Sequence, residues 1–207
     1  TGIAVNNINA SGVLIQNNII ANKIAGSDTG NQAAILSEPV GVGMKQATIS
    51  GNIISKWKHG IAFYPNTGML SAVVQNNIIQ DPTSDGHDLI GSYNTGLVQA
   101  SGNTYFSSTS TNQWFCNLNG SPDPNCWNGQ GSYLTSTWWQ ANVEPTARMQ
   151  RVDYPAVSVA SYNASVGGAN TYEDFIAQAR SQSKANWRTQ YTAQAANIYF
   201  RAAYGLG

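Results

Sequence analysis

An eight-residue pattern recurs four times in the first half of the chain, each time around an asparagine. Apolar residues stand five and three positions before that asparagine and two positions after it. Alternation before the asparagine indicates a short strand with one side in a core, and the asparagine then marks a turn into a second strand. The four segments are VLIQNNII at Val13–Ile20, ATISGNII at Ala47–Ile54, AVVQNNII at Ala72–Ile79 and VQASGNTY at Val98–Tyr105.

The four asparagines are separated by 34, 25 and 26 residues. A unit of this length cannot bury its apolar side alone, so the units are expected to stack, with each strand pairing with its equivalent in the next unit. Stacking brings the asparagine amides into register, where they bond to one another. A leucine-rich repeat would need a Leu-x-x-Leu-x-Leu framework, and a β-sandwich does not explain one asparagine in fixed register. The asparagines are Asn18, Asn52, Asn77 and Asn103.

This repeat resembles the right-handed parallel β-helix superfamily, which includes pectate lyases, polygalacturonase-like hydrolases, alginate lyases and epimerases, and phage tailspikes. The resemblance implies an all-β solenoid over residues 1–108. It also implies an extracellular polysaccharide as the partner. Because Thr1 enters repeat-like sequence without a cap, earlier coils of the same protein are expected as a second partner.

The repeat stops near Tyr105, and two further parts are expected after it. Residues 109–169 are rich in small polar residues and predict an irregular, loop-rich extension packed on the coils. Residues 170–207 predict a two-helix cap. Asn170 or Thr171 begins its first helix, and the second runs from about Thr192 to Ala203. A C-terminal region appended to some bacterial β-helix proteins is similar to three stretches of this chain, Val159–Ser165, Phe175–Arg188 and Tyr191–Ala193.

Charged residues are scarce, which restricts the classes of partner. They make up 10% of the chain, against roughly 25% in an average soluble domain, while the chain holds 23 asparagines. The formal net charge is zero, so no global field attracts nucleic acid or an anionic membrane. A surface of amides and hydroxyls instead suits neutral hydrogen-bonding partners such as sugars.

The two cysteines, Cys116 and Cys126, bracket a loop that contains Gly120, Pro122 and Pro124. No histidine or further cysteine lies close enough in sequence to complete a zinc site. A disulfide is therefore favoured over two free thiols, and it predicts a secreted or periplasmic protein.

Ionisable residues gather in two neighbouring repeats and form the candidate catalytic cluster. Aligning Gly60–Tyr64 with Asp88–Ser92 places His59 and His87 before equivalent strands. A lyase needs a proton-transferring group and a cation that neutralises the uronate, whereas a hydrolase needs two carboxylates about 5 to 9.5 Å apart. The alternative is that these side chains only cap turns. The candidates are Lys56, Lys58, His59, Tyr64, Asp85, His87 and Asp88.

The segment Asp85-Gly-His-Asp88 also resembles the Asp-Pro-His-Asp signature of alginate epimerases, with Gly86 in place of the proline. Three aromatic residues, Trp57, Tyr93 and Trp114, are the predicted sugar-stacking platforms, and anchoring a loop is their alternative role. No cofactor is expected, although an acidic cluster of this kind could hold Ca²⁺ through oxygen ligands.

The sequence thus predicts a portion of a polysaccharide lyase or glycoside hydrolase whose extracellular polysaccharide substrate is expected to be acidic, with the catalytic residues either in this chain or upstream. Two alternatives remain open at this point: a non-catalytic glycan-binding or adhesin module, and a tailspike-like attachment protein.

Overall fold

The chain divides into two compact units, Thr1–Arg151 and Val152–Gly207. The computed structural model describes residues 2–5, 12–21, 33–37, 45–63, 70–82, 89–108, 113–119, 126 and 131–206. The first unit holds all the named strands and one α-helix, and the second holds three α-helices.

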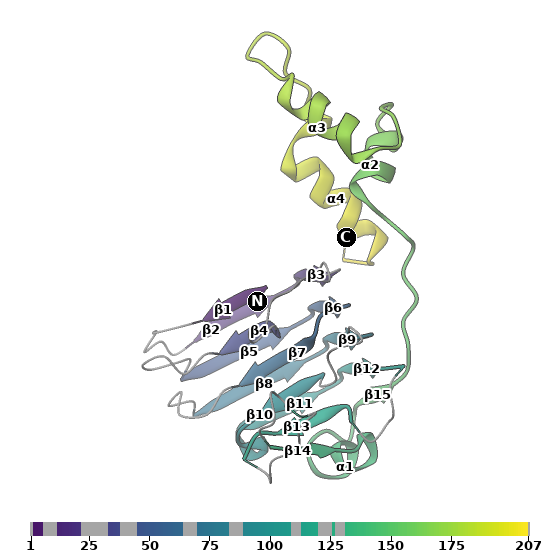
Figure 1. Ribbon diagram of the computed structural model, residues 1–207. Coiled ribbons are helices and arrows are strands. Elements are labelled where there is room, and N and C mark those ends of the chain that lie inside the picture. The colour runs from purple at the N-terminus through teal and green to yellow at the C-terminus, as the bar shows by residue number, and fades with distance from the viewer. Residues whose placement is uncertain are drawn as a thin grey trace. The chain divides into compact units, whose positions relative to one another are not determined.

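Three sheets form the first unit, and from β1 to β13 their strands follow one another in strict rotation along the chain (Figure 1). The first sheet contains β1 (Ile3–Val5), β4 (Ala33–Ser37), β7 (His59–Phe63), β10 (Ile90–Ser92), β13 (Phe115–Asn117) and β14 (Ser132–Leu134). The second sheet contains β2 (Val13–Gln16), β5 (Gln46–Ser50), β8 (Ser71–Gln75) and β11 (Val98–Ser101). The third sheet contains β3 (Ile19–Ala21), β6 (Ile53–Ser55), β9 (Ile78–Gln80), β12 (Thr104–Phe106) and β15 (Arg148–Met149).

Every strand pair is parallel except β13 with β14. The register matches the sequence repeat: Ile15 pairs with Ile49, and Ile49 pairs with Val74. In the second sheet these residues are buried and the residues between them are more exposed. Strict alternation therefore gives this sheet one core face and one outward face.

The predicted asparagine ladder is confirmed. Asn52 donates both its backbone N–H and its side-chain amide to Oδ1 of Asn77, each at 2.9 Å. Asn18 donates to Asn52 in the same way, and Asn77 to Asn103. The three inner asparagines are fully buried. Each of their side-chain amides also donates to a strand carbonyl of the preceding repeat, so their polar atoms are satisfied.

The residue before each ladder asparagine has a left-handed backbone, with φ of 55° at Asn17, 63° at Gly51, 53° at Asn76 and 66° at Gly102. Asparagine and glycine are the residues that adopt this conformation most readily. They alternate along the repeats. A Cβ on Gly51 would lie 2.4 Å from Oδ1 of Asn17, and one on Gly102 would lie 2.5 Å from Oδ1 of Asn76. Glycine thus leaves the space that the neighbouring asparagine fills.

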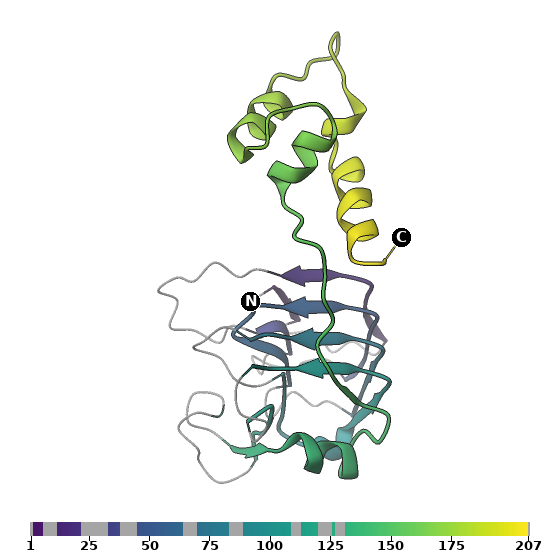
Figure 2. The same cartoon turned by 90° about the vertical axis from the view of Figure 1, so that its right-hand side faces the viewer.

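One end of the first unit is covered by α1 (Ser136–Asn142) and the turn after it (Figure 2). Thr135 caps this helix by accepting a hydrogen bond from the N–H of Trp138. The indole of Trp139 stacks on Phe115, with ring centroids 4.2 Å apart, and Tyr105 meets Phe115 edge to face. All three rings are fully buried, so α1 closes the core between the sheets.

The second unit contains α2 (Val159–Ser165), α3 (Tyr172–Arg180) and α4 (Ala193–Ala203). Ser158, Thr171 and Thr192 cap them. The two predicted C-terminal helices are thus confirmed, with Thr171 at the first cap. Tyr162 of α2 contacts the rings of Phe175 and Tyr199, which joins the three helices. The described residues also include two 3₁₀ turns, Thr95–Leu97 in the first unit and Thr189–Tyr191 in the second.

The predicted fold class, an all-β right-handed parallel β-helix, is corrected by the structure. The described residues form three separate sheets of parallel strands, none of them closed on itself, together with four α-helices, which makes the fold a mixed α/β arrangement. The sequence repeat predicts the positions of strands only as far as Phe106, the last residue of β12. Beyond it, hydroxyl caps at Thr135 and Ser158 begin helices in the segment for which the sequence predicted loops.

Candidate functional site

The outward face of the second sheet carries polar but uncharged side chains. None of the residues of β2, β5, β8 and β11, all of them described, is ionisable. Register places Gln16, Ser50, Gln75 and Ser101 in one column across the four strands. A second column holds Leu14, Thr48, Val73 and Gln99.

Successive side chains within a column are separated by the strand spacing of about 4.8 Å. Gln16, Gln99 and Ser101 are exposed, and Ser50 and Gln75 are half-buried. An amide offers both donors and an acceptor, and a hydroxyl offers one donor and two lone pairs. The face therefore presents regularly spaced groups that can exchange hydrogen bonds with the hydroxyls of a neutral chain. We call these two columns the neutral polar face.

The predicted catalytic cluster is only partly within the described residues. Tyr64, Asp85, His87 and Asp88 lie outside them. Of the others, Lys56 is exposed, Lys58 is half-buried and the side chain of His59 is 3% exposed at the start of β7. His59 therefore offers almost no surface to a polymer.

Lys56 stands at a corner of the repeat after β6, with a left-handed φ of 57°. Its backbone N–H donates to the carbonyl of Asp81, which occupies the equivalent corner after β9 with a φ of 50°. The carboxylate of Asp81 pairs with Arg151 at 3.3 Å. Asp81 is thus engaged in an ion pair rather than placed beside a second carboxylate.

The alignment that put His59 and His87 at equivalent positions is wrong by one residue. Ile61 pairs with Ile90, whereas the alignment paired Ile61 with Leu89. Gly60 lies opposite Leu89, and a Cβ on Gly60 would meet the carbonyl oxygen of Leu89 at 2.1 Å. A shift of one residue exchanges the two faces of a strand, so residues matched by that alignment do not lie on the same face of β7 and β10.

The three predicted sugar platforms differ in exposure. Trp114 is 4% exposed and lies edge to face with Phe106, so it is a core residue. Trp57 is half-buried and packs against the main core. Tyr93, at 38% exposed, alone of the three presents a largely accessible ring.

Glu144, which the sequence did not single out, is a buried carboxylate that accepts four hydrogen bonds. Its carboxylate is fully buried just beyond α1. Oε1 accepts the backbone N–H of Asn103 at 2.7 Å and its side-chain amide at 3.0 Å. Oε2 accepts Tyr105 Oη–H at 2.8 Å and Trp139 Nε1–H at 3.4 Å. Glu144 thus takes the place that a fifth asparagine would occupy.

Burial raises the pKa of Glu144, and the hydrogen bonds from Asn103, Tyr105 and Trp139 oppose that rise. Burial also raises the pKa of Tyr105 well above its usual value, and the negative charge of Glu144 raises it further. Since no part of the carboxylate reaches solvent, this arrangement terminates the ladder and does not form an active site.

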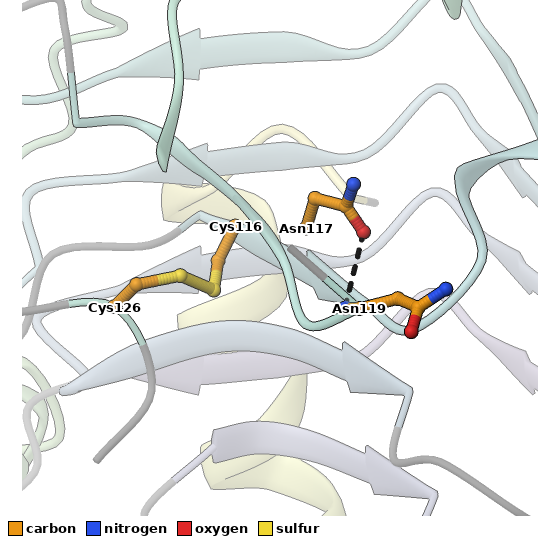
Figure 3. Close-up of a disulfide and its surroundings, with 4 residues drawn as sticks. All are labelled: Cys116, Asn117, Asn119 and Cys126. Atoms are coloured by element: carbon orange, nitrogen blue, oxygen red, sulfur yellow. Dashed lines mark hydrogen bonds between the residues drawn. A yellow bond between two sulfur atoms is a disulfide. The ribbon is translucent and has the colours of Figure 1, made fainter. Parts of the chain in front are cut away.

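The predicted disulfide joins Cys116 and Cys126, with Cα atoms 5.9 Å apart (Figure 3). Both cysteines are fully buried in a second apolar cluster, separate from the main core, with Ala33, Leu36, Ala62 and Leu118. Asn117 next to the disulfide accepts the N–H of Asn119.

Changing both Cys116 and Cys126 to serine should lower the free energy of unfolding by about 2.5 kcal/mol, from the loop-closure entropy that the crosslink removes. Urea unfolding of the variant and of the oxidised native chain measures the difference. Reduction of the native protein should reproduce the loss, whereas the serine variant should not respond to reductant. Equal stability of the oxidised chain and the variant would contradict this prediction.

Within the described parts of the chain, no three His, Cys, Asp or Glu side chains are placed to hold a metal ion. Among the same residues, no helix is both long and apolar enough to cross a bilayer.

Comparison with known proteins gives no relative from which a function could be transferred. No family model, curated protein or solved structure matches the chain. The function therefore rests on the residues themselves.

Proposed function

We propose that this chain is a glycan-binding module that holds a neutral extracellular polysaccharide on the neutral polar face. The observation that carries the proposal is the column of amides and hydroxyls formed by Gln16, Ser50, Gln75 and Ser101, with Thr48 and Gln99 beside it, on four strands that carry no charge. A neutral sugar chain loses no ionic hydration when it binds there. An anionic polymer would find no cation on these strands.

The disulfide supports an oxidising, extracellular location for such a module. The low charge of the whole chain favours the same class of partner. Lyase or hydrolase activity stays a prediction, and one observation weighs against a described member of its predicted cluster: His59 is buried.

The double change Gln75→Ala and Gln99→Ala should weaken binding of a neutral polysaccharide by at least about tenfold, because each glutamine supplies hydrogen bonds worth about 1 kcal/mol. Affinity electrophoresis in gels containing neutral or acidic polysaccharides gives the comparison. Gln194→Ala, at an exposed position of α4 in the other unit, is the matched control and should bind normally.

Retention of acidic polymers in preference to neutral ones, or equal retention of the double variant, would refute the proposal. The same polysaccharides are then incubated with the native chain and assayed for new reducing ends and for unsaturated ends. New reducing ends without unsaturated ends would show that the chain is a hydrolase, and unsaturated ends would show that it is a lyase.

A further inference from the structure

All three sheets end on the same side of the first unit in β1, β2 and β3, each of which pairs with one other strand among the described residues. The sheet orders run from β1, β2 and β3 through the later repeats. At the opposite side, the antiparallel strand β14, the short strand β15 and the helix α1 follow the last repeat. Figure 1 shows β1, β2 and β3 together at one end of the stacked strands and β13, β14 and α1 at the other.

The asparagine ladder has a direction, and its acceptor end lies at this same edge. Oδ1 of Asn52, Asn77 and Asn103 each receives two N–H groups from the asparagine of the preceding repeat. Asn18 donates forward, but no group among the described residues donates to its Oδ1. The free acceptor therefore marks the place of one more asparagine ahead of Asn18.

The residues of the repeat at this edge are also less buried than their equivalents in the later repeats. Asn18 is half-buried, whereas the three later asparagines are fully buried. Ile20 is half-buried, while Ile54 and Ile79, its equivalents in the next two repeats, are 1% exposed. Leu14, on the outward face of β2, is 58% exposed. Asn18 and Ile20 thus lack the cover that their equivalents in the later described repeats receive.

A second copy of the chain is a poor partner for this edge. Two copies meeting edge to edge would bring the two Asn18 Oδ1 atoms toward each other, and two acceptors without a proton repel. The other end of a second copy cannot supply donors either, because the N–H groups of Asn103 already bond to Glu144. The edge needs a parallel segment whose own asparagine donates.

We propose that the edge formed by β1, β2 and β3 is an interaction surface for a polypeptide segment with the repeat's own pattern, two short parallel strands joined at an asparagine. That asparagine donates its backbone N–H and its side-chain amide to Oδ1 of Asn18. The strands add to β2 and β3 by ordinary parallel pairing. This inference does not depend on the glycan-binding proposal.

The test adds such a segment to the full chain. A copy of Gln46–Lys58, which contains β5, β6 and the connection to β7, is fused directly ahead of Thr1. The register supports this junction, since Ile3 pairs with Ile35 and Ile35 pairs with Ile61. The control is the same fusion with Asn52→Ala in the copy only, which leaves the native ladder untouched.

The fusion should slow amide hydrogen exchange in β2 and β3 by at least about tenfold and raise the urea midpoint, and the control fusion should retain less than half of either effect. Equal protection by both fusions would overturn the role of the asparagine, and protection by neither would overturn the surface itself. A dimer of the unextended chain that the fusion dissociates would show that a second copy is the occupant, and would also overturn the proposal.

Discussion

Replacing Glu144 by alanine should lower the free energy of unfolding of the first unit by about 4 kcal/mol, the scale for removing one partner of a buried charged network. The change leaves the two N–H donors of Asn103, the hydroxyl of Tyr105 and the indole N–H of Trp139 buried without their acceptor. It also opens a cavity against three fully buried rings. Urea unfolding followed by near-ultraviolet circular dichroism reports directly on these aromatics.

Glu144→Gln is the matched control, because its side-chain oxygen can still accept both bonds from Asn103. It should lose less than half as much stability as Glu144→Ala. If the two variants were equally stable, the hydrogen bonds to Asn103 would not be the source of the effect.

The native chain and Glu144→Gln should also differ in their dependence on pH. Burial raises the pKa of Glu144 above its usual 4.5, so the folded state binds the proton more tightly than the unfolded state does. The stabilisation of the folded state that comes from proton binding by Glu144 is therefore fully present below the pKa of the unfolded state. It is lost as pH rises through the pKa of the folded state. The native chain should gain stability relative to the glutamine variant as pH falls from neutral through that window. A stability difference that does not change with pH would contradict the raised pKa.

Asn77→Ala should cost about 3 kcal/mol, because a buried donor or acceptor left without a partner costs about 1 to 3 kcal/mol. The substitution removes the acceptor for both donors of Asn52 and the side-chain donor to Oδ1 of Asn103, while the backbone N–H of residue 77 can still donate to that oxygen. The carbonyl of Ile49 loses a donor as well. Denaturant unfolding of the purified variant measures the loss.

Asn76→Gly is the control for this experiment, since it changes the adjacent, exposed asparagine. Its backbone is left-handed, and glycine occupies the equivalent position at Gly51 and Gly102. The control should stay within about 0.5 kcal/mol of the native chain, as surface substitutions usually do. A comparable loss at both positions would mean that the buried ladder is not the source of the stability.

The sequence repeat predicted the ladder and the strands around it because both depend on local spacing. Alternating apolar residues before an asparagine determine which side of the strand is buried, and each repeat contains that information in full. The alignment of β7 with β10 was wrong by one residue because it was based on the positions of the two histidines. Ile61 and Ile90 were the residues in true register, and apolar residues on both sides of them made either alignment compatible with burial.

Glu144 could not be found from the sequence, since its partner Asn103 lies 41 residues away and nothing local distinguishes a buried carboxylate before a proline. The helix α1 was missed for a different reason. The many small polar residues of 109–169 predicted loops, and the capping hydroxyl of Thr135 does not stand out among them. The four catalytic candidates outside the described residues stay predictions.

The alternation of Asn17, Gly51, Asn76 and Gly102 has a consequence for how such a chain can lengthen or shorten. Excising the unit of Gly51 would bring two asparagines, Asn17 and Asn76, into neighbouring repeats, where their side chains would compete for one space. Excising the unit of Asn76 would bring Gly51 and Gly102 together and leave that space vacant. Removing or duplicating two units together preserves the order. Evolution of this architecture, and any redesign of its length, should therefore proceed more easily by even steps than by odd ones.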